Sequence, residues 1–132
     1  MASILVVEDN AANMKLAVLV LETAGYRVLP ATDAETGLTL ALELRPDLIL
    51  MDIQLPGMDG LAATAILKGD EATRDIPVIA LTALVMKGDK ERILAAGCDG
   101  YVGKPIAYRE LLAVVAARLA PALANVAPSV RP

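Results

Sequence analysis

The 132-residue chain has no histidine, no tryptophan and no phenylalanine, and its single cysteine is Cys98. The lack of histidine and of a second thiol argues against a structural zinc site and against a Ser-His or Cys-His nucleophile pair. A lone cysteine cannot form an intramolecular disulfide, which agrees with the reducing conditions of the cytoplasm. Three tyrosines are the only aromatic residues, so the core has to be built from aliphatic side chains.

The sequence also lacks an excess of positive charge and any apolar run long enough to cross a membrane. Its formal net charge is −4 and its isoelectric point is about 4.7, which argues against electrostatic binding to nucleic acids or anionic lipids. No apolar stretch approaches the ~18 residues of a membrane span. The start, MASILVVEDN, has no basic region and soon reaches acidic residues, unlike a signal peptide. We therefore expect a cytoplasmic protein that binds neither nucleic acids nor membranes.

Apolar residues nevertheless make up 56% of the chain and form alternating strand-like and helix-like segments. Short continuous apolar runs are typical of parallel strands that are covered on both faces, and apolar residues three or four positions apart are typical of helices. The predicted strands are residues 3–7, 27–30, 48–51, 77–81 and 100–102, and the predicted helices are residues 11–24, 32–44, 60–68, 87–96 and 107–119. This alternation predicts an α/β fold with a five-stranded parallel sheet of order 2-1-3-4-5 and helices on both faces.

Local signals mark the ends of some of these segments. Thr32, with Glu35 three residues later, has the pattern of a capping box at the start of the second helix. No linker divides residues 1–120, which we expect to form one domain. The stretch from Pro121 contains three prolines in twelve residues. We expect this proline-rich stretch to be unable to continue the last helix, so residues 121–132 are predicted to be a mobile tail.

Polar and charged residues follow four of the five predicted strands. Glu8 and Asp9 follow the first strand, Asp52 the third, Thr82 the fourth and Lys104 the fifth. In an open parallel sheet, ligands bind outside the carboxyl ends of the strands. We therefore expect three carboxylates, a hydroxyl and an ammonium group to converge on one site.

The three carboxylates predict a metal site. Clustered carboxylates repel one another, and a hard divalent cation relieves that repulsion. Mg²⁺ binds oxygen atoms from carboxylates, carbonyl groups, water and phosphate. Asp9 and Asp52 are the expected direct ligands, together with the backbone carbonyl of Gln54, and Glu8 is expected to act through water.

The same site is suited to accept a phosphoryl group. With its charge screened by the metal, the Asp52 carboxylate can attack phosphorus and become an acyl phosphate. The new phosphoryl oxygens need donors besides the metal, and the Thr82 hydroxyl and Lys104 ammonium groups are expected to supply them.

Four stretches of the sequence, LVVEDN, LILMDIQLPGMDG, IALTA and YVGKPI, resemble the receiver domain of two-component response regulators. The resemblance covers residues 3–119, with all four motifs in order at strand ends. It implies a phosphorylation-dependent signalling switch rather than an enzyme that acts on other molecules. The stretches EDNxxNMKL, DIQLP and MKGD are more specifically similar to single-domain members. Receivers of hybrid histidine kinases share the EDNxxN start, so an excised kinase receiver remains an alternative.

The resemblance also implies a role for each site residue. Asp52 would be the phosphoacceptor, Glu8 and Asp9 the acidic metal pair, and Lys104 the lysine that pairs with the phosphoryl group. The Lys104-Pro105 peptide bond would be cis. The donor would be a histidine kinase or histidine phosphotransfer protein, since this chain has no histidine. The output would be a contact with a downstream protein target.

Two residues are implied to change conformation on phosphorylation. Thr82 would be the switch hydroxyl that moves toward the phosphoryl group, and Tyr101 would be the aromatic side chain that rotates in response. For Tyr101, a plain structural role at the rim of the core remains open.

Ordinary structural roles are the alternatives for the other residues. Asp52 could cap a turn, Glu8 and Asp9 could cap the helix that follows them, Thr82 could be a helix N-cap, and Lys104 could be a solvated surface lysine. A small phosphatase with an aspartyl-phosphate intermediate would need a second acid two residues after Asp52, where the sequence has a glutamine. A flavin or nucleotide carrier would need small phosphate-binding residues in place of the first acidic pair.

The first predicted helix carries apolar residues beyond those needed for one buried face. On a 3.6-residue repeat, the face expected to pack on the sheet contains Asn13, Leu16, Ala17, Val20, Leu21 and Ala24. Met14, Val18 and Leu19 lie off that face, next to the acidic site. We interpret these three residues as a docking surface for the phosphohistidine partner, with deeper burial of the helix as the alternative.

Overall fold

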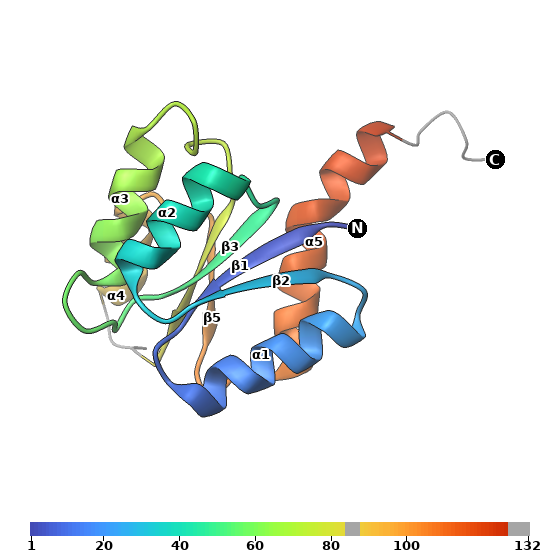
Figure 1. Cartoon of the computed structure of the whole chain (residues 1–132), viewed down its shortest axis with the longest axis horizontal. Coiled ribbons are helices and arrows are strands. Elements are labelled where there is room, and N and C mark those ends of the chain that lie inside the picture. The colour runs from blue at the N-terminus through green and yellow to red at the C-terminus, as the bar shows by residue number, and fades with distance from the viewer. Residues whose placement is uncertain (84–87, 127–132) are drawn as a thin grey trace.

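The structure, a computed structural model, describes residues 1–83 and 88–126, with side chains up to Leu119. Its strands form one parallel sheet in the order β2-β1-β3-β4-β5, which confirms the predicted order (Figure 1). The strands are β1 (Ser3–Val7), β2 (Arg27–Ala31), β3 (Leu48–Asp52), β4 (Val78–Thr82) and β5 (Gly100–Gly103). The helices are α1 (Ala11–Thr23), α2 (Ala34–Leu44), α3 (Gly60–Gly69), α4 (Asp89–Ala95) and α5 (Tyr108–Val126).

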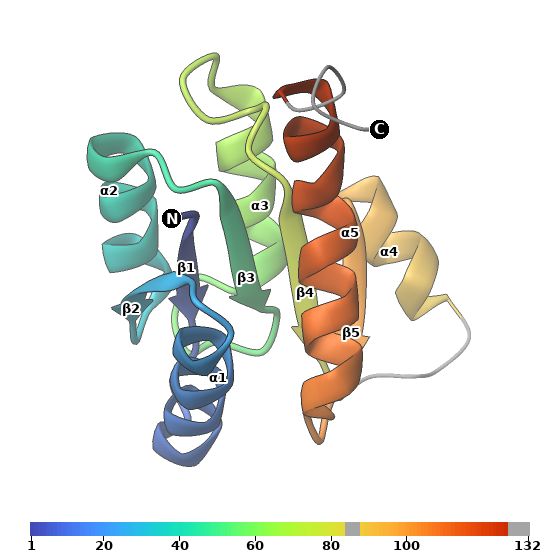
Figure 2. The same cartoon turned by 90° about the vertical axis from the view of Figure 1, so that its right-hand side faces the viewer.

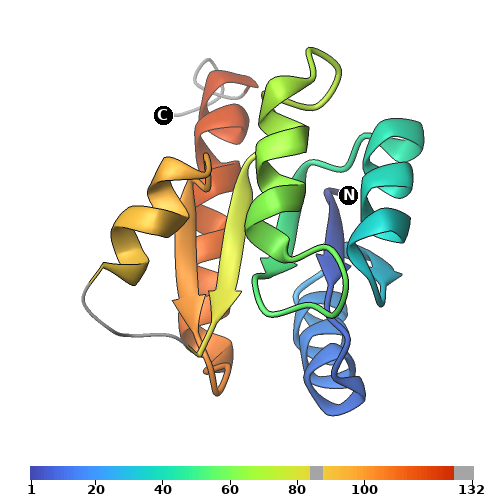
Figure 3. The same ribbon diagram turned by 90° about the vertical axis from the view of Figure 1, so that its left-hand side faces the viewer.

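The helices cover both faces of the sheet. Helices α1 and α5 lie on one face and α2, α3 and α4 lie on the other (Figures 2 and 3). Alternate residues of β1 pack into the two core layers, one on each face of the sheet, because successive side chains of a strand point to opposite faces. Ile4 and Val6 pack with α1 and α5, and Leu5 and Val7 pack with α2 and α3. The buried core residues of both layers in the described chain include no aromatic side chain, and Tyr26 packs against one layer only partly buried, in agreement with the shortage of aromatic residues.

The parallel arrangement places the carboxyl ends of all strands at one edge. Val7 pairs with Met51 of β3, and Asp52 pairs with Leu81 of β4. Thr82 in turn pairs with Gly103 of β5. The polar residues that follow these strands are therefore brought to the same edge of the sheet.

Some boundaries differ from those predicted. Helix α2 is capped by Asp33, whose Oδ1 atom accepts the Thr36 N–H group at 2.7 Å, so the assignment of the cap to Thr32 is wrong. Thr32 and Asp33 are both good N-cap residues, and here the tertiary fold starts the helix one residue later. The predicted start of the fourth helix at Lys87 lies outside the described residues.

Helix α5 runs to Val126, beyond the predicted end at Leu119. Proline removes one backbone donor and disfavours a helix by roughly 3 kcal/mol, but it does not by itself end one, so the prediction of a stop at Pro121 is wrong. Residues 127–132 of the predicted tail lie outside the described residues. Neither α5 nor any other helix in the described part of the chain is long and apolar enough to span a bilayer.

Candidate functional site

The first acidic pair sits where β1 meets α1. Glu8 follows β1 directly and is 1% exposed, whereas Asp9 is exposed. The N-cap of α1 is Asn10, which accepts the Asn13 N–H group at 2.9 Å. The Asn10 N–H group in turn donates to Oε2 of Glu8 at 3.1 Å. Asn10, rather than the acidic pair, therefore caps the helix, and the Asn10 N–H group holds one oxygen of Glu8 in place.

Asp52, the last residue of β3, lies at the centre of the site and is 1% exposed. Its Oδ1 atom accepts the Gln54 N–H group at 2.9 Å, and its Oδ2 atom lies 2.9 Å from Nζ of Lys104. The same ammonium group lies 2.9 Å from Oε1 of Glu8. Lys104 thus bridges two buried carboxylates from two neighbouring strands, so it is not a solvated surface lysine.

These contacts set opposite protonation tendencies on the two buried acids. Burial raises the pKa of Glu8, and the neighbouring Asp52 carboxyl raises it further. Burial alone would also raise the pKa of Asp52. Hydrogen bonds from Glu8, the Gln54 N–H group and the ammonium group outweigh that effect and hold the Asp52 pKa below its ordinary value. Burial disfavours the charged form of Lys104, but the two carboxylates outweigh it and raise the Lys104 pKa.

The backbone of β5 carries Lys104 into this position. The Lys104 N–H group donates to the Thr82 carbonyl oxygen at 2.8 Å, which ties the end of β5 to the end of β4. The peptide bond between Lys104 and Pro105 is cis, as the resemblance implies. Thr82 is 1% exposed, and the residue at the N-cap of α4 is Gly88, so Thr82 does not cap that helix. Tyr101 is 42% exposed on β5.

The acidic residues are placed to hold a cation. One carboxylate oxygen from each of Glu8, Asp9 and Asp52 lies within 4.8 Å of the others. The Lys104 ammonium group lies against this cluster, 2.9 Å from an oxygen of Glu8 and 2.9 Å from an oxygen of Asp52. A divalent cation would balance the remaining negative charge of the three carboxylates. The donor set, all oxygen, fits Mg²⁺.

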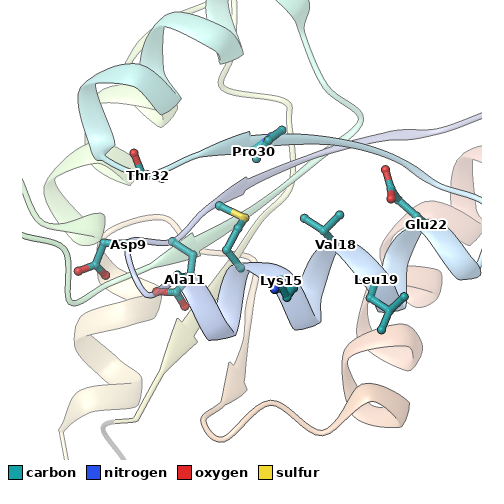
Figure 4. Close-up of a pocket in the computed structure, with 10 residues that line it drawn as sticks. Asp9, Ala11, Lys15, Val18, Leu19, Glu22, Pro30 and Thr32 are labelled. Atoms are coloured by element: carbon teal, nitrogen blue, oxygen red, sulfur yellow. The ribbon is translucent and has the colours of Figure 1, made fainter.

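A groove runs from this acidic site along α1. It is lined by Glu8, Asp9, Ala11, Met14, Lys15, Val18, Leu19, Glu22, Pro30 and Thr32 (Figure 4). Val18 points from α1 toward the strand that carries Pro30, and Leu19 points to the other side of the helix. A second, smaller hollow on the α5 side of the helix also includes Leu19, together with Tyr108. The predicted docking residues therefore border hollows on both flanks of α1.

The buried face of α1 is narrower than predicted. Ala17 and Leu21 are fully buried, but Leu16 is 37% exposed and Ala24 is also exposed. Met14, placed off the buried face by the repeat, is half-buried and packs with the core. The helical repeat defines faces only up to a rotation, and the packing of α1 beside both β2 and α5 sets that rotation. Pro30, on the far wall of the groove, was not predicted, because it comes from the neighbouring strand.

Comparisons with known proteins agree with this geometry. A family model described as the response regulator receiver domain matches residues 4–116. Over 113 residues, the chain is 49% identical to the polar-differentiation response regulator DivK of Brucella anthropi and to DivK of Brucella ovis. Each match covers 86% of this chain and 92% of the relative.

Solved structures with the same fold include receivers of different regulatory proteins. The receiver domain of sensor histidine kinase PA1611 from Pseudomonas aeruginosa has a magnesium ion coordinated in its active site cleft. It superposes with a TM-score of 0.84 at 38% identity, covering 90% of this chain and 98% of that one. A putative response regulator from Chloroflexus aurantiacus gives a TM-score of 0.86 at 31% identity, with the same coverages.

Proposed function

Because this chain belongs to the response regulator receiver family, we propose that Asp52 accepts a phosphoryl group from the phosphohistidine of a partner protein and thereby switches a protein-binding surface. The observation that carries this proposal is the setting of Asp52. Its carboxylate is buried at a strand end, held between the Gln54 N–H group and the Lys104 ammonium group, and close to two further acids.

The contacts of Asp52 suit a nucleophile. Its lowered pKa keeps the carboxylate ionised near neutral pH, which attack on phosphorus requires. In the transfer, an Asp52 oxygen forms a bond to phosphorus while the bond from phosphorus to the histidine nitrogen breaks, and the imidazole leaves. The Lys104 ammonium group, already 2.9 Å from Asp52 Oδ2, is in place to pair with the incoming phosphoryl oxygens.

We propose that the acidic cluster holds Mg²⁺. Asp9 and Asp52 would be direct ligands, with the backbone carbonyl of Gln54 as a third, and Glu8 would act through water. When bound, the ion would supply positive charge beside the phosphoryl group, where three carboxylates otherwise repel it. The exposure of Asp9 leaves this side of the site open to solvent and to a donor.

A phosphoryl switch also explains the site better than the competing enzymatic role. The residue two positions after Asp52 is Gln54, whose side chain cannot act as the general acid of a phosphatase. We infer that the chain promotes only its own phosphorylation and dephosphorylation. The 49% identity to DivK, against 38% to a kinase receiver, favours a regulator of the DivK type over a hybrid-kinase receiver.

The test of this function measures the conformational change that phosphorylation is expected to cause. Acetyl phosphate with Mg²⁺ should shift the backbone amide NMR signals of residues 100–103, and a chelator should prevent the shift. We propose that Thr82 and Tyr101 carry the change, because Thr82 is buried at the site and Tyr101 lies two strand positions before Gly103, the partner of Thr82. A Thr82→Ala variant should still take up phosphate but shift these signals less. Equal shifts in Thr82→Ala and wild type would contradict the role of Thr82, and no shift in wild type would contradict the switch.

The groove along α1 supports a docking role for Met14, Val18 and Leu19. Leu19 is 64% exposed although it is apolar, and Val18 is half-buried over the groove. One end of the groove reaches Glu8 and Asp9, so a partner seated on α1 would lie next to the site. We propose that the phosphohistidine partner docks here by apolar contact.

A charge placed in the groove should separate docking from chemistry. Val18→Glu should slow phosphoryl transfer from a cognate phosphohistidine protein by roughly ten-fold, because it puts a carboxylate into an apolar contact. Labelling by acetyl phosphate should be unchanged. Ala65→Glu, an equivalent change at an exposed position of α3 on the other face of the sheet, is the control. Unchanged transfer from the protein donor would rule out the groove as the docking site.

A further inference from the structure

The first turn of α3 lies directly against the backbone of the strand end that carries Asp52. A Cβ atom at Gly60 would lie 2.1 Å from the Asp52 carbonyl oxygen and 2.7 Å from the Cα atom of Ile53. Both atoms belong to the backbone and cannot swing away as the end of a flexible side chain can. The Gly60 N–H group also donates to the Ile53 carbonyl oxygen at 3.3 Å. The lack of a side chain at Gly60 is therefore what allows α3 to approach Asp52 so closely.

Neighbouring groups hold this turn in place. The N-cap residue Asp59 accepts the Ala62 N–H group at 2.8 Å. The hydroxyl of Thr64, which is fully buried, donates to the Gly60 carbonyl oxygen at 2.8 Å. The buried Cys98 thiol donates in turn to the Thr64 hydroxyl oxygen, with a distance of 3.8 Å between sulfur and oxygen. The turn is thus tied to the segment between α4 and β5 as well as to β3.

The peptide that Gly60 contacts also determines where the Asp52 carboxylate points. The Ile53 N–H group donates to the Leu81 carbonyl oxygen of β4 at 3.2 Å, so β4 holds this peptide on one side and α3 holds it on the other. The next residue, Gln54, supplies the N–H group that orients Asp52 Oδ1. A displacement of this peptide would move the Asp52 Cα atom and the Gln54 N–H group, and would change the position of the Asp52 carboxylate relative to Lys104.

We propose that Gly60 is a positioning residue for phosphoryl transfer: its bare Cα lets the first turn of α3, locked by the Thr64 hydroxyl, set the position of the Asp52 carboxylate. This role rests on the proposed function of Asp52 as the phosphoacceptor. In this proposal Gly60 contacts neither the phosphoryl donor nor the metal ion, and it acts only through the backbone at Asp52.

The test compares two glycines of the same helix. Gly60→Ala should lower the rate constant for phosphorylation by acetyl phosphate at saturating Mg²⁺ by roughly 10- to 100-fold, because transfer is sensitive to small displacements of the nucleophile. Gly69→Ala should react like wild type, since a Cβ atom there meets nothing within 4 Å. The amide NMR signal of Gln54 should move in Gly60→Ala and stay in place in Gly69→Ala, which reports the geometry of the acceptor directly.

A third variant separates a loss of protein stability from a displacement of the Asp52 carboxylate. Gly25→Ala is strained by a φ angle of +97° just beyond the carboxyl end of α1, whereas the site lies at the start of that helix, so it should destabilise the protein without slowing the reaction. Rates are compared per folded molecule, at a temperature where each variant is folded. If Gly60→Ala loses only stability, with a wild-type rate and Gln54 signal, the positioning role is overturned.

A milder pair of variants serves if Gly60→Ala does not fold. Thr64→Val keeps the side-chain shape but removes the hydroxyl, and should slow phosphorylation by about five-fold, whereas Thr64→Ser should keep the wild-type rate. Equal rates in these two variants would overturn the locking role of the hydroxyl. A wild-type protein that takes up no phosphate at all would overturn the proposed function instead, which keeps the two failures apart.

Discussion

Replacing Asp52 with asparagine is expected to abolish phosphorylation of the protein. Asparagine keeps the size of the side chain and can still accept the Gln54 N–H group, but its amide is not a nucleophile toward phosphorus. Incubation with acetyl phosphate and Mg²⁺ should add one phosphoryl group to the intact mass of the wild type. The Asp52→Asn variant should show a rate at least about 100-fold lower, as expected when the attacking group itself is removed.

The matched control for this change is Asp59→Asn. Asp59 lies in the loop that follows β3 and caps α3, a role that asparagine fills equally well. Asp59→Asn should therefore be labelled like the wild type and unfold at a similar temperature. Undiminished labelling of Asp52→Asn would mean that another residue is the acceptor.

Removal of the Asp9 carboxylate is expected to eliminate the stabilisation of the protein by Mg²⁺. A ligand that binds only the folded state raises the free energy of unfolding by RT ln(1 + [Mg²⁺]/Kd), which is about 1–2 kcal/mol at a ten-fold excess over Kd. In the wild type, the unfolding temperature should rise with Mg²⁺ along this curve. Asp9→Asn should remove a ligand and also relieve repulsion within the cluster, so its metal-free form should be slightly more stable and its response to Mg²⁺ should disappear.

An equal change of charge away from the site provides the control for Asp9. Glu71 is exposed just beyond the carboxyl end of α3, whereas the site lies near the start of that helix. Glu71→Gln should keep the full Mg²⁺ response. If the unfolding temperature of Asp9→Asn climbs with Mg²⁺ as steeply as that of Glu71→Gln, Asp9 is not a ligand.

The residues of the site could be predicted because their location depends on the topology of the sheet rather than on the packing of individual side chains. Once the alternation of strands and helices indicates a parallel sheet, every strand must end at the same edge, and Glu8, Asp52 and Thr82 stand at three of those ends. Lys104 follows by the same reasoning. Its bridge between two buried carboxylates could not be predicted in the same way, because it depends on the neighbouring positions of β1 and β3 and on the bond that ties Lys104 to β4.

The misplaced residues have a common physical origin. The 3.6-residue repeat places Leu16 on the buried face of α1 and Met14 off it. In the structure Leu16 is 37% exposed, and Met14 is half-buried and packs with the core while it also lines the groove, because the repeat does not specify how the helix is rotated against its neighbours. The cap of α2 was assigned to Thr32 rather than Asp33, two residues of similar capping strength. The role that we infer for Gly60 could not be predicted from the sequence, because it depends on the backbone of Asp52 and Ile53 lying close to Gly60 in the folded chain.

The most direct test of the account is to locate the phosphoryl group. The wild-type protein is treated with acetyl phosphate and Mg²⁺, the acyl phosphate is trapped by reduction with borohydride, and the modified residue is identified by mass spectrometry of the digested protein. We expect the modification at Asp52 alone, and its disappearance when Mg²⁺ is chelated. Modification at Glu8, Asp9 or another carboxylate, with Asp52 unchanged, would contradict the assignment of Asp52 as the phosphoacceptor.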